Sequence, residues 1–117
     1  MCIRDRDSTG GGIGISADGN GEQLTIRNSI IAGNSDNGTA PDFVAPQNAS
    51  DLTVQFSLIG GNTGTGLTEA PVGSVDANGN LIGGSTNGVI DPILGELDDN
   101  GGPTQTHALL DLSLIHI

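Results

Sequence analysis

Two stretches of this chain repeat one another 28 residues apart, and this repeat constrains the fold more than any other feature. Residues 24–34, LTIRNSIIAGN, align with residues 52–62, LTVQFSLIGGN, and six of the eleven positions are identical. A shorter third copy, residues 80–86, NLIGGST, follows the second at an offset of 23. A period in the twenties is typical of solenoids, whose units bury their apolar faces on one another. The repeat therefore predicts an all-β solenoid of parallel strands, with about four coils.

Within each copy, apolar and polar residues alternate, which assigns the two faces of each predicted strand. The residues expected to point inward are Leu24, Ile26, Ile30, Leu52, Val54, Phe56 and Leu58. The residues expected to point outward are Thr25, Arg27, Ser29, Thr53, Gln55 and Ser57. Like residues then stack on like, with Leu24 beside Leu52 and Ile26 beside Val54. A further strand is expected over residues 10–15.

Asn-Gly dipeptides support an antiparallel alternative, because this pair favours the two-residue turns of β-hairpins. They occur at residues 20–21, 37–38, 78–79, 87–88 and 100–101. Some of these are compatible with local hairpins. A meander of hairpins does not require similar residues to repeat at an interval equal to one coil of a solenoid. The parallel arrangement is therefore favoured.

The acidic charge balance disfavours negatively charged partners. The net charge is −11, with fourteen acidic residues against three arginines and no lysine. Nucleic-acid binding depends on clustered cations, and anionic membrane surfaces attract them too, so neither partner is expected. Membrane insertion is not expected either, since no apolar run approaches the roughly 20 residues of a transmembrane helix. An acidic, Asn- and Gly-rich chain suits an extracellular or cell-surface location.

Both ends differ in composition from the middle of the chain. Residues 1–6, MCIRDR, hold two of the three arginines and the only cysteine, Cys2, and residues 112–117, LSLIHI, contain neither Gly nor Asn. Both hexapeptides resemble translated adapter sequence at the ends of metagenomic reading frames. We therefore expect a non-native leader at 1–6, a native repeat region at 7–111 and a non-native tail at 112–117. A signal peptide is expected upstream of this chain.

Residues 99–110, DNGGPTQTHALL, resemble the C-terminal signature of bacterial right-handed parallel β-helix repeat proteins of the choice-of-anchor Q type. The copies ending in residues 32–34 and 60–62 resemble the coils of that family. The resemblance implies a pectin-lyase-like, right-handed β-helix within a large secreted or surface-anchored bacterial protein, of which this chain is a C-terminal fragment. After the paired leucines the chain departs from the family, which continues there with a Pro-Gly-Ser-Pro type of sequence. That departure leaves the end of the domain and any sorting tail undefined.

Many parallel β-helices act on polysaccharides, so catalytic residues would be expected among the Arg, Asp and His side chains. Arg27 is the only candidate base or cationic clamp of a lyase, and a lone outward arginine is more typical of a solvated surface. Asp98 and Asp99 are adjacent, whereas hydrolases hold two carboxylates at a set distance across a sugar. His107 has no second histidine at metal-binding spacing, so a structural hydrogen bond is expected. We assign no catalytic, cofactor-binding or metal-binding residue.

Three further motifs carry weak signals. Residues 76–80, DANGN, resemble alternating oxygen ligands for Ca²⁺, but no bidentate Glu follows and Asp-Asn-Gly is ordinary turn sequence. No cofactor is expected, with weak calcium binding as the alternative. Residues 12–14, GIG, lack the third glycine and following helix of a nucleotide site. Residues 37–39 and 48–50 fit the glycosylation sequon.

These observations predict a structural or adhesive, adhesin-like segment of a secreted or surface-anchored bacterial protein, with carbohydrate or cell-surface glycans as partner. The alternative is a non-catalytic piece of a polysaccharide lyase or glycoside hydrolase whose active coils lie elsewhere. The full gene distinguishes them, since it contains either a catalytic constellation or a long monotonous array ending in an anchor.

Overall fold

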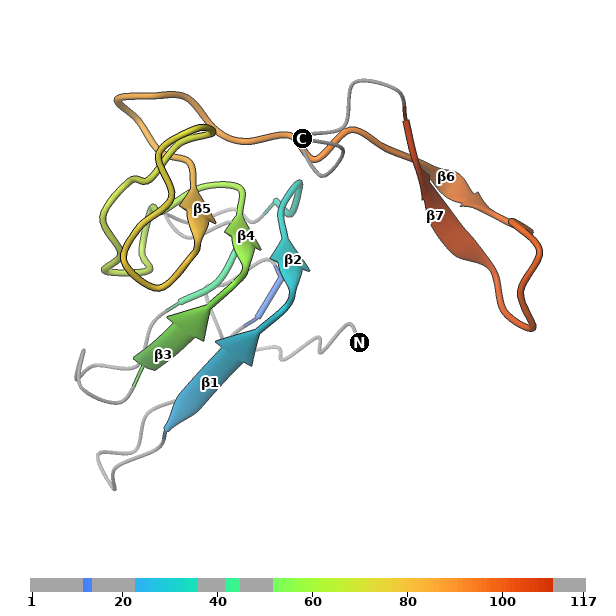
Figure 1. The fold of residues 1–117 in the computed structure, drawn as a ribbon, viewed down its shortest axis with the longest axis horizontal. Coiled ribbons are helices and arrows are strands. Elements are labelled where there is room, and N and C mark those ends of the chain that lie inside the picture. Colours follow the sequence, from blue (N-terminus) through green and yellow to red (C-terminus); the bar gives the residue numbers. More distant parts are fainter. Residues whose placement is uncertain (1–11, 14–22, 36–41, 45–51, 111–117) are drawn as a thin grey trace.

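The computed structural model describes residues 12–13, 23–35, 42–44 and 52–110, which form seven strands in three small sheets (Figure 1). The strands are β1 (Leu24–Arg27), β2 (Ile30–Ile31), β3 (Leu52–Gln55), β4 (Leu58–Ile59), β5 (Leu81–Ile82), β6 (Leu94–Asp98) and β7 (Thr106–Leu109). One sheet pairs β1 with β3, a second has the order β2-β4-β5, and a third pairs β6 with β7. In these residues no helix is long and apolar enough to cross a bilayer.

The first two sheets are parallel, and their register confirms the pairing predicted from the repeat. In β1 and β3, Leu24 lies opposite Leu52 and Ile26 opposite Val54. In the second sheet Ile31, Ile59 and Ile82 line up across three strands. Parallel neighbours need long connections, which the repeat offsets of 28 and 23 residues supply.

The apolar core lies on the inner side of the two parallel sheets. Ile26 and Val54 come from the first sheet, and the aligned isoleucines Ile31, Ile59 and Ile82 come from the second. Phe43 and Ala70 complete the buried cluster, and Phe43 and Ile59 are fully buried. Burying such a side chain stabilises the fold by about 1.5–3 kcal/mol, so these aliphatic stacks are the main source of stability among the residues described.

The prediction of a right-handed β-helix of about four coils is wrong. Among the residues described, the parallel sheets have only two and three strands, they do not close into a solenoid, and the C-terminal sheet is antiparallel. Repeated sequence correctly identified which strands pair. It carried no information about whether the chain completes a coil between them.

The third copy explains why the parallel order stops. Where the first two copies form β1 and β3, the third forms a turn over residues 76–80, in which Asp76 Oδ1 accepts hydrogen bonds from the backbone N–H groups of Asn78 and Asn80. The outer edge of β5 is also occupied. Ala70 and Ile82 exchange two backbone hydrogen bonds of 2.7 and 2.8 Å in an antiparallel bridge. No further parallel strand continues from β5 among the residues described.

Strands β6 and β7 form a hairpin that projects away from the parallel sheets (Figure 1). Asn100 and Gly101 lie in its connecting loop, and the Asn100 side chain donates to the carbonyl oxygen of Thr106 at 2.8 Å. A hairpin is therefore present at this Asn-Gly, but residues 99–105 connect its strands instead of a two-residue turn. The antiparallel interpretation also fits residues 84–88, where Gly84 and Gly88 form an antiparallel bridge.

Two predicted inward residues point outward instead. Ile30 is 42% exposed while its neighbour Ile31 is 8% exposed, and Phe56 is 66% exposed. Side chains do not alternate strictly between inward and outward because Asn28 and Phe56 have left-handed backbone, with φ of 49° and 50°, which turns the chain between consecutive strands. The inward–outward alternation therefore restarts after each of these residues.

Several expectations concern residues that lie outside the described ranges. These are the leader 1–6 with Cys2, the tail 112–117, and both sequons at 37–39 and 48–50. Of the strand expected over residues 10–15, only Gly12 and Ile13 are described, and Ile13 forms a parallel bridge with Phe43.

Candidate functional site

The three repeats share a corner at which the chain passes from one parallel sheet to the next. The corner residues are Asn28, Phe56 and Gly79, with φ of 49°, 50° and 77°. They are separated by the repeat offsets, 28 and 23 residues. Glycine and asparagine adopt left-handed backbone readily, but a bulky side chain there is an outlier. The corner therefore holds Phe56 in a conformation that its own chemistry disfavours.

Backbone hydrogen bonds fix the order of these residues along the corner. Asn28 N–H donates to the carbonyl of Gln55 at 3.2 Å, and Phe56 N–H donates to the carbonyl of Asn78 at 3.1 Å. Phe56 is thus flanked by Asn28 on one side and by Asn78 and Gly79 on the other. We call Arg27, Asn28, Gln55, Phe56 and Asn78 the outer corner.

A polar ladder, one residue further along each repeat, braces the corner from within. Ser29 N–H donates to Ser57 Oγ, and Ser57 N–H donates to Asn80 Oδ1. Asn80 is 1% exposed, and its amide also donates to the carbonyl of Val54 at 2.8 Å and to Asp76 Oδ2 at 2.9 Å. Since buried polar groups are costly unless paired, this ladder specifies one geometry for the turn.

The Phe56 ring lies against the backbone of Gly79. A Cβ atom placed on Gly79 would be 2.7 Å from a ring carbon, closer than carbon atoms normally approach. Glycine at residue 79 therefore creates the space that the ring occupies. With 66% of the residue still exposed, Phe56 presents a large apolar surface to solvent.

The polar residues of the outer corner neighbour Phe56 along the backbone, and their side chains have no partner among the residues described. Arg27 lies opposite Gln55 in the β1–β3 register. The side chains of Arg27, Asn28, Gln55 and Asn78 form no hydrogen bond or ion pair with any described residue. Arg27 is also the only Lys or Arg within the described ranges. The outer corner thus combines an apolar ring, three free amides and one guanidinium.

Asp42 is the most deeply buried charged residue described, at 2% exposure. Its Oδ2 accepts a 2.6 Å hydrogen bond from Gly61 N–H, and its Oδ1 accepts from the backbone and amide nitrogens of Asn34. Its own carbonyl accepts from the N–H groups of Gly12 and Ile13. Asp42 therefore connects three separate segments of the chain and has a structural role.

Two other carboxylates organise turns. The backbone N–H of Thr86 lowers the pKa of Glu69 below its ordinary value, and the backbone and side-chain N–H groups of Asn87 add to this effect against partial desolvation. Desolvation raises the pKa of Asp76, but hydrogen bonds from Asn80 and Asn78 outweigh it and lower the pKa overall. Both groups are therefore favoured in their ionised form.

The suspected calcium loop at residues 76–80 uses its oxygens internally. Both carboxylate oxygens of Asp76 accept hydrogen bonds from within the turn. In the described part of the chain no three His, Cys, Asp or Glu side chains gather as a metal site would require. The Asp-Asn-Gly composition that suggests a Ca²⁺ loop is here the composition of a hydrogen-bonded turn.

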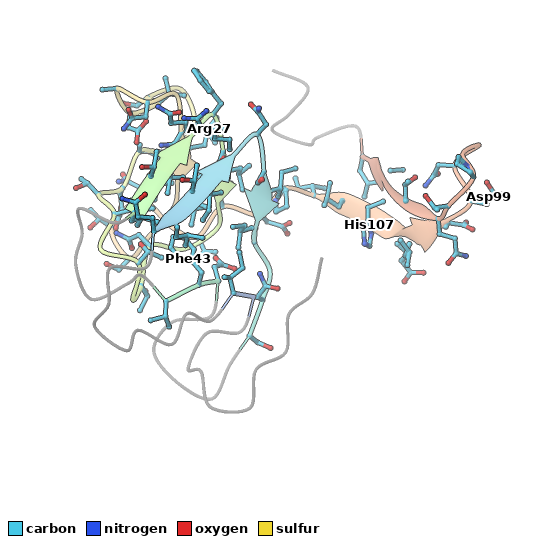
Figure 2. All side chains as sticks on the ribbon, turned by 90° about the horizontal axis from the view of Figure 1, so that it is seen from below. Arg27, Phe43, Asp99 and His107 are labelled. Atoms are coloured by element: carbon cyan, nitrogen blue, oxygen red, sulfur yellow. The ribbon has the colours of Figure 1, made fainter. Side chains whose placement is uncertain are left out.

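The remaining catalytic candidates lie apart from one another. Asp99 and His107 are on the projecting hairpin, away from Arg27 and Phe43 on the parallel part (Figure 2). Asp98 and Asp99 accept hydrogen bonds from the backbone N–H groups of the loop, and His107 Nδ1 lies 2.7 Å from the carbonyl oxygen of Gly95. These contacts are structural. The structure does not bring Arg27 together with this carboxylate pair.

Sequence reasoning missed the outer corner because it assigned Phe56 to the core. A usable signal existed in the alignment of the copies. Asn28, Phe56 and Gly79 occupy the same repeat position, and Asn and Gly are the two residues most tolerant of left-handed backbone. That pairing predicts a turn at this position and therefore an outward ring.

Comparison with known proteins gives no relative from which a function could be transferred. No family model, no curated protein and no solved structure matches this chain. The geometry and chemistry of the outer corner are therefore the best indication of function.

Proposed function

We propose that this segment is a structural and adhesive part of a secreted or surface-anchored bacterial protein, which makes weak contacts with carbohydrate through the outer face of its parallel strands. The observation that carries the proposal is the outer corner, where the exposed Phe56 neighbours polar residues whose side chains have no partner in the described part of the chain. Amide and guanidinium groups that lack partners among the described residues are available to the hydroxyl groups of a glycan.

Two features of the sequence support the location and the partner. The net charge of −11 keeps such a protein soluble and disfavours polyanionic partners. The resemblance of residues 99–110 to bacterial surface proteins supports a secreted or surface-anchored parent. No resident metal or cofactor is part of the proposal, because the oxygens of the Asp76 turn are used in its own hydrogen bonds.

The test is retention of the full chain on columns of immobilised neutral plant and bacterial polysaccharides at about 150 mM salt, where surface charges are largely screened. We expect measurable retardation, reduced in the double variant Arg27→Ala/Gln55→Ala. The matched control is Thr104→Ala/Gln105→Ala, which removes exposed polar side chains from the hairpin loop. Equal elution of all three proteins with the void volume would contradict the proposal.

Catalysis is tested separately. The same protein is incubated with pectate, alginate and xylan, with and without Ca²⁺, and product formation is followed. We expect no turnover, since an acid, a base and a charge clamp are needed together. Cleavage that is abolished by Arg27→Ala or Asp98→Ala would replace the adhesive role with an enzymatic one.

A further inference from the structure

We infer that the outer corner is a carbohydrate-binding subsite in which the Phe56 ring stacks on the apolar face of a neutral hexopyranose unit. Phe56 is the largest apolar side chain exposed among the residues described, with 66% of its surface accessible. Left-handed backbone at this residue directs the side chain outward, where the ring packs against Gly79. Strained positions that persist in a fold are often functional, so a bulky αL residue at a solvent-exposed corner is a candidate binding position.

The ring is positioned in advance of binding. Gly79 supports one side of Phe56, and the backbone hydrogen bond from Phe56 N–H to the Asn78 carbonyl fixes its position along the corner. A ring that is already oriented loses little conformational entropy when a ligand stacks on it. Aromatic side chains with few rotatable bonds are efficient anchors for the same reason.

The polar side chains of the outer corner have the donors and acceptors that sugar hydroxyls need. Each amide of Asn28, Gln55 and Asn78 offers donors and an acceptor, and sugar hydroxyls likewise both donate and accept. Arg27, opposite Gln55 in the register, adds donors only. An apolar peptide would leave these groups without partners and in part desolvated, which is unfavourable. An apolar platform with an amide rim therefore favours a pyranose over a peptide.

The charge distribution selects a neutral sugar. Arg27 is the single cation in the described segments of a chain whose net charge is −11. A polyuronate would gain one charge contact and would meet repulsion from the remaining surface, only partly screened at a Debye length of about 8 Å in physiological salt. Neutral β-linked oligosaccharides avoid this penalty.

The expected affinity is low. One exposed ring on an open surface buries little ligand area, and a dissociation constant of about 1 mM corresponds to such a contact. Adhesion would then depend on many copies acting on one polymer, because linked weak contacts raise the overall avidity.

The subsite presupposes the carbohydrate-contacting role proposed above, and its test uses a readout specific to Phe56. The chain contains no Trp or Tyr and two Phe, of which Phe43 is fully buried. Saturation-transfer NMR irradiates the aromatic ring protons, which belong to two Phe and two His, and loss of the transfer in Phe56→Gly assigns the signal to this one ring. The probe is a β-1,4-linked glucose hexasaccharide, with a galacturonate hexasaccharide in a parallel titration.

We expect saturation to transfer to the ring C–H protons of the neutral sugar. Phe56→Gly should weaken binding at least about tenfold, equivalent to ~1.4 kcal/mol. Glycine suits the left-handed backbone at residue 56, so this variant removes the ring while it preserves the corner. Asn28→Gly removes one amide under the same backbone constraint and should weaken binding less. Leu97→Ala, which removes an exposed apolar side chain from the hairpin, is the matched control and should bind normally.

Three results would overturn the subsite. If Phe56→Gly binds as tightly as the parent while Arg27→Ala/Gln55→Ala does not, the adhesive face stands and the stacking role is wrong. If the galacturonate oligomer binds more tightly than the neutral one, the assignment of a neutral sugar is wrong. If the parent chain is retained by no polysaccharide, both the subsite and the proposed function fail.

Discussion

At the scale of single residues, backbone strain in the described part of the chain lies at bulky residues that adopt a left-handed conformation. Phe56 and Ile93 have φ of 50° and 49°. Left-handed backbone costs an L-residue with a Cβ roughly 1–2 kcal/mol. Asn28 shares the conformation, but asparagine tolerates it through its short polar side chain. The strain therefore resides mainly at Phe56 and Ile93.

Replacing Phe56 by glycine should stabilise the protein. Phe56 is mostly exposed, so little burial is lost, and relief of the left-handed strain should raise the free energy of unfolding by about 1 kcal/mol. Chemical denaturation measures the change. Phe56→Ala is the control, because it removes the ring and retains the Cβ. If the glycine variant is no more stable than the alanine variant, strain at this corner is not significant.

Stability should fall as the solution is acidified through the ordinary carboxyl range. Hydrogen bonds lower the pKa of Glu69 and Asp76 in the folded state. Below about pH 4 the unfolded state therefore binds more protons than the folded state, and the free energy of unfolding decreases. The stabilisation is fully present above the unfolded pKa values and is lost as pH falls through the folded ones.

Denaturation midpoints measured between pH 7 and pH 3 test this dependence. Glu69→Gln and Asp76→Asn should each be less stable at pH 7, and each should reduce the loss of stability between pH 7 and pH 3, which we call the acid limb. Asp98→Asn, an exposed substitution on the hairpin, is the control. An acid limb that is unchanged in both variants would show that neither carboxylate is responsible.

At the scale of elements, stability depends on where a strand lies within its sheet. β4 is the centre of the three-stranded sheet, and its Ile59 is fully buried. β2 is at an edge, and its Ile30 is 42% exposed. The same side-chain deletion should therefore have different consequences in these two strands.

Ile59→Ala should cost about 3–4 kcal/mol, because it removes buried methylene groups and leaves a cavity. Ile30→Ala should cost less than about 1 kcal/mol, since its side chain is already in contact with solvent. Equilibrium unfolding of the two variants measures both values. Equal costs would mean that the core is not centred on β4.

The same contrast shows what the sequence could predict. Matching copies identified the strand partners and the stacked Leu24–Leu52 and Ile26–Val54 pairs, because identical patterns bury identical faces. The alternation of inward and outward side chains could not predict the outward position of Phe56, since a left-handed residue turns the chain and the alternation starts again in the next strand. Asp76 was ambiguous because the oxygens that suit a cation also accept backbone hydrogen bonds. The Asn-Gly dipeptide at residues 100–101 indicated the antiparallel hairpin, but the repeat favoured a fold with parallel strands throughout.

At the scale of the whole molecule, two opposing terms govern association between copies. The net charge of −11 makes copies repel one another. Within the described residues, the sheets are small, and the β6–β7 hairpin pairs with no third strand. Unpaired strand edges are templates for association with another chain. Electrostatic repulsion therefore protects these edges.

Light scattering across salt concentration tests this balance. We expect a monomer at about 10 mM salt and association at about 500 mM, where the Debye length becomes only a few ångströms. Leu97→Lys, which places a charge on the exposed hairpin, should reduce association at high salt. Scattering that stays flat or decreases as salt rises would contradict the role of charge.

The hairpin also determines how the chain would respond to mechanical load. Its two ends are adjacent, because Leu94 pairs with Leu109 and Leu110 N–H donates to the carbonyl of Ile93 at 3.3 Å. A pulling force between residues 91 and 110 would therefore break these pairs one after another, as a zip opens, instead of shearing them together. Full opening would release about 55 Å of contour length. Because its pairs break one at a time, the hairpin would open at low force.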